Sequence, residues 1–356
     1  MSGALPPGGP APGGPPATRP TVLLSSSDIR RLVTITDVIE AVGLAAREHA
    51  AGPISRAPRV GIPGGGTLLM AAASAERGGV AAKIVSIAPA NRAAGLATIQ
   101  GLAVWFDYGT RQPLLVADAT AMTALRTGGL SGAATKALAP PDASVLAMIG
   151  VGGQAQCQVE AVAAVRPIEQ VRLVSLRRPS AEQFCQQLCA VLPGRRISVV
   201  DDVAAAVRDA DIVCLATTST AALIEHADLQ PGVHVNAVGA YRPDMREVGI
   251  SVFGAASVVC ADDREGALRE AGDLMDAVAL GALDPASLLE LGMIMDRAGD
   301  APAREDRQGR GDRQARGDAP TVFKSVGSSA ADLALLDLLL QRARAEPGLP
   351  TIDFAR

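Results

Sequence analysis

The stretch Gly150-Val151-Gly152-Gly153-Gln154-Ala155 decides the fold of this chain. It follows an apolar run, 144–149, and precedes 156–165, a helix-like stretch without Gly or Pro. A strand, a glycine turn and a helix form the context in which a G-x-G-x-x-A motif indicates dinucleotide binding. The unpaired N–H groups at the start of the helix favour the negative charge of a diphosphate. The alternative interpretation is a structural turn between a strand and a helix.

Within this motif each residue type has a physical reason. Gly150 permits the tight turn, and Gly152 lets the backbone approach a pyrophosphate. Gly153 and Gln154 complete the loop, and Ala155 lets the helix pack closely on the strand. We therefore expect these five residues to hold the cofactor.

Strand-like and helix-like segments alternate between residues 143 and 263. This alternation predicts an open, mostly parallel, doubly wound α/β sheet of the Rossmann type. The strand candidates are 144–149, 171–176, 197–200, 211–216, 233–238 and 257–261, with helix candidates that include 180–192 and 202–209.

Length and composition narrow the function class. A chain of 356 residues predicts two domains. With 33 basic and 37 acidic residues and few aromatic ones, the sequence argues against a nucleic-acid partner. No apolar run reaches the length of a membrane span. Five cysteines without a C-x-x-C pair predict reduced thiols in the cytoplasm, and three scattered histidines predict no metal site.

Two segments have compositions that disfavour a packed structure. Residues 1–20 are rich in Gly, Pro and Ala and lack the features of a signal peptide, so we expect a disordered tail. Residues 299–319 contain a short tandem duplication, 306–311 and 312–317, without an apolar residue to bury. A disordered surface insertion is expected there, and a nucleic-acid tether is the alternative.

The end of the second predicted strand bears on the choice of nicotinamide cofactor. An acidic residue at this place normally holds the ribose 2′-hydroxyl of NAD. Here Ser175 occupies the position, and Arg177 and Arg178 follow. A hydroxyl and guanidinium groups suit a 2′-phosphate. The sequence therefore favours NADP(H), with NAD(H) as the alternative. The two arginines could instead belong to a solvated turn.

Four cations precede or flank the glycine motif. Lys83 lies in a run of small apolar residues, an unusual place for an unpaired ammonium. Arg126 stands just before a glycine pair, and Arg56 and Arg59 lie in a Pro-containing loop. Guanidinium forks grip a carboxylate well. A lysine near two arginines is pushed towards neutrality and can exchange protons near pH 7. The alternative is that each is an ordinary surface cation; from spacing alone this interpretation is preferred for Arg59 and equally good for Arg56.

Taken together, the motifs resemble the ornithine cyclodeaminase/μ-crystallin family. The resemblance runs in order through residues 25 to 345. The matching segments are 83–91, 96–98, Gly101, 124–129, 150–155, 216–218, 236–240, 242–247 and 321–327.

The resemblance implies a split architecture and a reaction class. Residues 21–122 with 321–356 would form an α+β domain that binds substrate and makes a homodimer, and 123–320 would form the inserted Rossmann domain. Members act on a carbon that alternates between amine and imine beside a carboxylate, with a nicotinamide exchanging hydride. The expected ligand is thus a small imino or amino acid.

The resemblance also carries roles onto individual residues. Arg56 and Arg126 would hold the carboxylate, with Arg59 as a competitor for the role of Arg56. Lys83 would polarise or protonate the substrate nitrogen or an attacking water. Three threonines would contact or approach the cofactor, namely Thr98, Thr127 and Thr217.

Two departures separate the chain from true ornithine cyclodeaminases. Those enzymes carry an aspartate where this chain has Tyr241, and a glutamate where it has Leu68. Both losses remove anionic partners for a distal amine, and an unpaired ammonium in a dry pocket is costly. We therefore expect an NAD(P)H-dependent reductase of α-imino acids or cyclic ketimines, giving L-amino acids. The alternatives are ornithine cyclodeaminase itself and a non-catalytic protein that binds NADPH and a small carboxylate.

Overall fold

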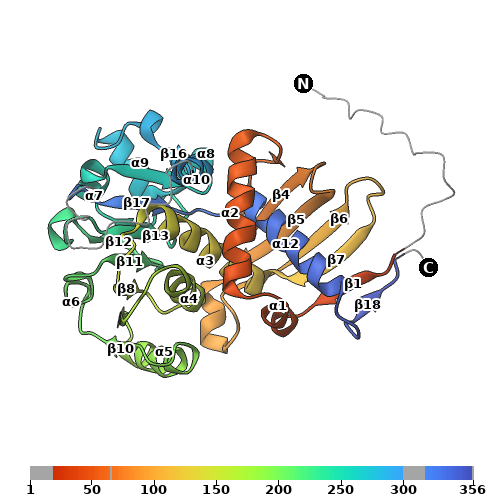
Figure 1. The fold of residues 1–356 in the computed structure, drawn as a ribbon, viewed down its shortest axis with the longest axis horizontal. Helices are drawn as coiled ribbons and strands as arrows, with labels where there is room; N and C mark the ends of the chain where they lie inside the picture. The colour runs from red at the N-terminus through yellow and green to blue at the C-terminus, as the bar shows by residue number, and fades with distance from the viewer. Residues whose placement is uncertain (1–18, 65, 300–316, 355–356) are drawn as a thin grey trace.

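Two eight-stranded sheets and the helices packed on them make up the structure (Figure 1). The computed structural model describes residues 19–64, 66–299 and 317–354. Most of the expected tail, and residues 300–316 of the expected insertion, lie outside the described residues.

The first sheet is mixed and built mainly from the N-terminal part of the chain. Its strand order is β18-β1-β7-β6-β5-β4-β2, and β3 also pairs with β4. The strands are β1 (Thr21–Leu24), β2 (Ser55–Arg56), β3 (Val60–Ile62), β4 (Thr67–Ser74), β5 (Gly79–Ile87), β6 (Ile99–Asp107), β7 (Pro113–Asp118) and β18 (Thr351–Ile352).

One face of the first sheet is covered by helices. From Gly79 to Val85 of β5 every second residue is buried, which is the period-2 pattern of a sheet with one covered face. The helices are α1 (Ser26–Leu32), α2 (Ile35–Ala51), α3 (Ala119–Leu138) and α12 (Ser329–Arg344); α12 lies against β4 and β5 (Figure 1). The leucine-rich helix α12 packs on the sheet, as its apolar composition requires.

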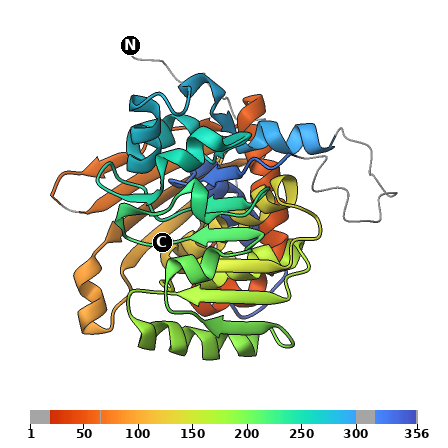
Figure 2. The same cartoon turned by 90° about the vertical axis from the view of Figure 1, so that its left-hand side faces the viewer.

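The second sheet is entirely parallel among its eight strands. Its order is β10-β9-β8-β11-β13-β17-β15-β16, and Figure 2 brings this sheet to the front. The strands are β8 (Val145–Ile149), β9 (Gln170–Val174), β10 (Arg196–Val199), β11 (Ile212–Leu215), β13 (His234–Ala237), β15 (Val258–Ala261), β16 (Leu289–Glu290) and β17 (Thr321–Lys324). The expected doubly wound sheet is confirmed, and its strand order reverses at β8, the place where dinucleotides bind.

Helices and a small strand pair complete this half. The helices are α4 (Ala155–Val165), α5 (Arg178–Val191), α6 (Val203–Val207), α7 (Ile250–Ala255), α8 (Arg264–Glu270), α9 (Gly272–Ala279) and α10 (Leu291–Gly299), with short 3₁₀ turns η2 (His226–Asp228) and η3 (Pro285–Ser287). A third 3₁₀ turn, η1 (Pro89–Ala94), connects β5 and β6 of the first sheet. The strand pair is β12 (Thr220–Ile224) with β14 (Arg246–Val248).

The return of the chain differs from the expected boundary at residue 321. Strand β17 pairs with β13 and β15 inside the second sheet, so the chain rejoins the first sheet only after Lys324. The reason is that three of the four residues of β17, Val322 to Lys324, are buried, and the strand completes a parallel ladder. This strand carries the chain across the junction to α12, where the functional residues gather.

A candidate active site between the two sheets

The glycine loop has the geometry that the motif predicts. Gly150 has φ +91°, and a Cβ there would lie 2.7 Å from the carbonyl oxygen of Ala216, so only glycine is accommodated without strain. A Cβ at Gly152 or Gly153 would meet no atom within 4 Å. Helix α4 starts just beyond them, and no side chain caps its first N–H groups. This open cradle at a helix start fits a diphosphate.

Two further loops of the second sheet are held together by a buried carboxylate. Oε1 of Glu247 accepts hydrogen bonds from N (2.6 Å) and Oγ1 (2.8 Å) of Thr217, after β11. Oε2 accepts from N of Gly239 (2.6 Å) and N of Ala240 (3.1 Å), after β13. Glu247 is fully buried. Glu247 therefore fixes both loops at the carboxyl edge of the sheet. The hydroxyl of Thr217 already donates its hydrogen bond to Glu247.

Lys83 lies in a buried charge cluster on β5. Its Nζ lies 2.8 Å from Oδ1 and 2.7 Å from Oδ2 of Asp332, in the first turn of α12. The same Oδ1 accepts from Nε of Arg126, on α3, at 3.1 Å. The exposed fractions are 1% for Lys83, 2% for Asp332 and 5% for Arg126. Two cations thus share one carboxylate away from water.

The balance of these charges sets the proton affinity of Lys83. Burial lowers the pKa of Lys83 to about 8, Asp332 opposes this shift, and Arg126 and Arg59 reinforce it. The expectation that nearby arginines push this lysine towards neutrality is therefore matched in direction, with burial as the larger cause. A lysine with a pKa near 8 can give or take a proton close to neutral pH.

Arg59 links this cluster to an open cavity. Its Nη2 donates to the carbonyl oxygen of Gly327 (3.2 Å), and its Nη1 lies 3.1 Å from Oε2 of Glu270. A Cβ at Gly327 would lie 3.0 Å from Nη2 of Arg126, so both guanidinium groups converge on this glycine. The Nε of Arg59 is buried and has no hydrogen-bond partner among the described residues. This N–H is thus a buried donor whose hydrogen bond the described residues leave unmade.

The cavity beside Arg59 has a volume of about 280 Å³, which suits a small amino or imino acid. It lies between the β3–β4 hairpin of the first sheet and the loop after β13 with α8 of the second. Leu68 and Tyr241, the two departures noted in the sequence, both line it. The full lining is Arg59, Gly61, Gly66, Leu68, Ile87, Tyr241, Arg242, Pro243 and Glu270.

Arg56 lies elsewhere. Its Nη1 pairs with Oδ2 of Asp263 at 2.8 Å, and Arg56 does not line the cavity. The sequence analysis predicted Arg56, rather than Arg59, as the carboxylate ligand. The geometry favours Arg59, because Arg59 lines the cavity and Arg56 does not. Only two residues separate the two arginines, so the local conformation between β2 and β3 decides which one faces the cavity.

Two of the expected threonines occupy different settings. Thr127 is buried in α3, and its Oγ1 donates to the carbonyl oxygen of Thr123 at 2.8 Å. It lies on the helix that packs against α4, since a Cβ at Gly128 would lie 2.5 Å from the carbonyl oxygen of Cys157. Thr98 is half-buried before β6, and its carbonyl oxygen accepts from N of Ala88.

The ribose end of the site is exposed. Ser175 follows β9 and is half-buried, while Arg177 is exposed at the N-cap of α5. Arg178 is also exposed and pairs with Asp201 (2.6 Å) and Glu182 (3.0 Å). The guanidinium of Arg177 is therefore better placed for a new anion than that of Arg178.

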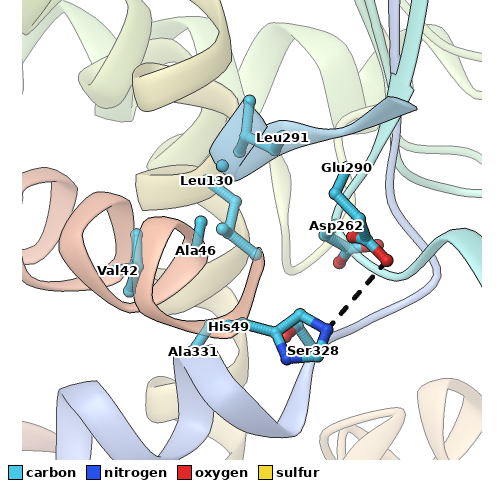
Figure 3. A pocket seen from close by; sticks show the side chains of 10 residues that line it. Val42, Ala46, His49, Leu130, Asp262, Glu290, Leu291, Ser328 and Ala331 are labelled. Atoms are coloured by element: carbon cyan, nitrogen blue, oxygen red, sulfur yellow. Dashed lines mark ion pairs between the residues drawn. The ribbon is translucent and has the colours of Figure 1, made fainter. Parts of the chain in front are cut away.

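A second, much smaller cavity lies at the end of α2 (Figure 3). His49 points at Glu290 of β16 across it, with 4.0 Å between Nε2 and Oε1, and Asp262 and Ser328 lie on its wall. Burial raises the pKa of Glu290 to about 7. The volume of this second cavity is about 10 Å³, so it holds about one water molecule and excludes an amino acid.

Three carboxylates of the site escaped the sequence analysis. Two of them had a feature that could have drawn attention to them. Glu247 is the last residue of the segment 242–247, which matches the family, and Asp332 is an acidic residue in a leucine-rich stretch. Glu270 had none. Among residues 19–64, 66–299 and 317–354, no group of three or more His, Cys, Asp or Glu could hold a metal. Within the same part of the chain, no helix is long and apolar enough to cross a membrane.

Comparisons with known proteins identify the family. A model of the ornithine cyclodeaminase/mu-crystallin family matches residues 19–346. The chain belongs to this family. It is 34% identical over 327 residues to Delta(1)-pyrroline-2-carboxylate reductase of Bacillus cereus, covering 90% of this chain and 96% of that protein. It is 31% identical to the mouse ketimine reductase mu-crystallin, over 76% of this chain and 78% of that protein.

A solved structure supports the same assignment. Thermococcus litoralis Delta(1)-pyrroline-2-carboxylate reductase in complex with NADH and L-proline has a TM-score of 0.84 and 28% identity, covering 93% of this chain and all of that one. An archaeal alanine dehydrogenase dimer with bound NAD has a TM-score of 0.82 and 28% identity, covering 94% and 100%. The family, the fold and the expected reductase class are confirmed, and a nicotinamide cofactor is supported.

Proposed function

We propose that this protein reduces the C=N bond of a cyclic ketimine or α-imino acid beside a carboxylate, giving an L-amino acid. The observation that carries the proposal is the buried cluster of Lys83, Asp332 and Arg126 next to the cavity at Arg59. Lys83, Asp332 and Arg126 do not themselves line the cavity; Arg59 does, and it contacts Gly327 beside Arg126. The names of the relatives, which are imine and ketimine reductases, support this reaction.

Arg59 and Arg126 are proposed to bind the substrate carboxylate. Both guanidinium groups converge on Gly327, and the Nε of Arg59 is a buried donor without a protein partner among the described residues. A planar fork binds a carboxylate through two parallel hydrogen bonds, which orients as well as holds it. The carboxylate then places the adjacent C=N bond in one defined geometry, the main catalytic effect expected of such a site.

Lys83 is proposed to give a proton to the substrate nitrogen. The C=N π bond breaks, one N–H bond forms with the proton from Nζ, and one C–H bond forms with a hydride. The nicotinamide cofactor supplies that hydride when bound. Lys83 is left as a neutral amine and regains a proton from water. A pKa near 8 suits this role, because the ammonium is populated at neutral pH and still gives up its proton readily.

The open backbone at Gly152 and Gly153 fits the cofactor's diphosphate. We propose NADP(H) as the preferred form, because Ser175 replaces the usual acid and Arg177 is exposed beside it. Arg177→Ala should lower the ratio of kcat/KM for NADPH to that for NADH by about tenfold or more, from the loss of a charge-assisted hydrogen bond. An unchanged ratio would point to NAD(H).

The side chain of the substrate is proposed to be uncharged. Leu68 and Tyr241 line the cavity where cyclodeaminases of this family carry acids. Glu270 is the carboxylate in the described lining, and Arg59 already faces it at 3.1 Å. A distal ammonium would therefore lack a counter-charge.

We also propose a cytoplasmic homodimer formed through the open face of the first sheet. Ile84 and Leu102 lie opposite each other on the central strands β5 and β6, and they are 51% and 59% exposed. Leu69 pairs with Ile84 from β4 on the same face. A contiguous apolar face on central strands favours burial against a second copy. Leu102→Glu should halve the mass measured by light scattering; an unchanged mass would contradict this interface.

The deciding experiment is absorbance at the reduced-nicotinamide band. The purified chain is mixed with NADPH or NADH and a panel of cyclic ketimines that includes Δ1-pyrroline-2-carboxylate. Oxidation is expected, and it should vanish in Lys83→Met while NADPH binding persists. The matched control is Lys136→Met, at an exposed lysine on α3. Ammonia released from ornithine with NAD⁺ would indicate a cyclodeaminase, and ligand binding without any turnover would indicate a binding protein.

A further inference from the structure

We propose that Asp332 is a positioning residue that keeps Lys83 charged as a proton donor and directs Arg126 towards the substrate. This inference rests on the proposed function and deepens it. It concerns the one charged member of the site that comes from α12, the C-terminal helix.

The geometry gives Asp332 two separate tasks. Both carboxylate oxygens lie within 2.8 Å of Lys83 Nζ, so the ammonium cannot rotate away without losing its counter-ion. The Nε of Arg126 is also bound, at 3.1 Å. Asp332 thus holds Arg126 through its Nε atom. In our proposal, the two Nη atoms of Arg126 bind the substrate carboxylate. The absence of a side chain at Gly327 keeps the space beside these atoms open.

The surroundings make the charge of Asp332 decisive. Lys83 faces Arg126 from α3 and Arg59 from the segment between β2 and β3, and both are cations. Its neighbours across the sheet, Met70 on β4 and Ala103 on β6, are apolar. Asp332 is thus the anion in direct contact with Lys83.

Loss of this charge has one predictable result. An arginine does not give up its proton in proteins, so Lys83 would deprotonate to relieve the repulsion. Removing an opposite charge at such short distance lowers a lysine pKa by roughly 1–3 units. The lysine would then be neutral at neutral pH and could not donate a proton.

The sequence offers an unusually direct test. The chain contains three lysines, Lys83, Lys136 and Lys324. Labelling with [ε-¹³C]lysine should give three methylene signals in NMR spectra, each assigned by one substitution. The full chain is titrated as wild type and as Asp332→Asn. The Lys83 signal should titrate roughly 1–3 pH units lower in the variant, while Lys136, which is exposed, stays unmoved.

The matched control is Asp337→Asn on the same helix. Asp337 is largely buried and pairs with Arg77 at 3.5 Å, so its loss removes a comparable carboxylate without touching Lys83. Where Asp332→Asn does not fold, Asp332→Ser removes the same charge and leaves space for water. An unmoved Lys83 signal in the folded variant overturns the proposal.

Kinetics separate this role from a merely structural one. In Asp332→Asn, the pH at which kcat for imine reduction declines should move down with the Lys83 titration, and NADPH affinity should stay unchanged. A uniform loss of kcat at every pH, with an unshifted Lys83 titration, would overturn the inference. If the wild type reduces no imine, the reductase proposal fails, and the lysine titration still decides whether Asp332 controls Lys83.

Discussion

Replacing Glu247 by Gln should destabilise the fold and loosen the cofactor site together. The substitution conserves shape, but its amide nitrogen cannot accept a hydrogen bond. Either the N–H and hydroxyl of Thr217 or the two N–H groups of Gly239 and Ala240 then lose their acceptor. An unsatisfied buried donor costs about 1–3 kcal/mol, so two of them cost about 2–6 kcal/mol. The neutral side chain is less costly to bury, which favours the lower half of this range.

The assay is urea unfolding followed by circular dichroism and by the fluorescence of Trp105, the single tryptophan, which is buried in β6. Coincident transitions establish two-state unfolding, so that the midpoint shift converts to a free energy. NADPH affinity, measured by fluorescence titration, should fall because the loops after β11 and β13 lose their common anchor. The control is Asp244→Asn, whose exposed pair with Arg242 should matter by less than about 0.5 kcal/mol. A Glu247→Gln protein with wild-type stability and NADPH affinity would refute this reasoning.

Three further predictions address other parts of the site. The rate of imine reduction should decline as pH rises through about 8, because Lys83 must be protonated to act, and the rate of amino-acid oxidation should rise over the same interval. A reduction rate that does not depend on pH up to pH 10 would exclude Lys83 as the proton donor. Gly150→Ala should lose at least about 1–2 kcal/mol of unfolding free energy in urea, because Gly150 has a positive φ. Gly153→Ala should keep its stability and bind NADPH more weakly. Equal stabilities of the two variants would contradict the strained turn at Gly150. Arg59→Ala should raise the substrate KM at least tenfold, whereas Arg56→Ala should affect mainly stability, and the reverse order would restore Arg56 as the carboxylate ligand.

The second sheet was largely predictable from sequence because its information is local. Each of the six expected strands is a short apolar run bounded by turn residues, and all six occur in the structure. Strand β17 was not assigned to this sheet, since four residues, Thr321–Lys324, do not reveal which strands they will pair with. Pairing with β13 and β15 is a tertiary outcome. A local pattern therefore identifies strands better than it identifies their neighbours.

The site was predictable only where residue type and motif coincided. Lys83 and Arg126 stood out because cations are unusual beside small residues and glycine pairs. Asp332 lies 249 residues from Lys83 in sequence, so no spacing rule connects them. The choice between Arg56 and Arg59 likewise depends on how the segment between β2 and β3 turns, which a three-residue difference in sequence does not specify.

The return of the chain through β17 explains why the two halves form one site. Lys324 pairs with Asp273 at 2.9 Å inside the second sheet, and the N–H of Gly327 donates to Asp262 at 3.0 Å. The carbonyl oxygen of the same Gly327 accepts from Arg59, and five positions later Asp332 binds Lys83. One short segment thus binds carboxylates of the cofactor half and cations of the substrate half. Because its charges and backbone groups are satisfied on both sides, a shift of either half would leave buried groups unpaired, and this cost holds the proton donor in register with the cofactor loops.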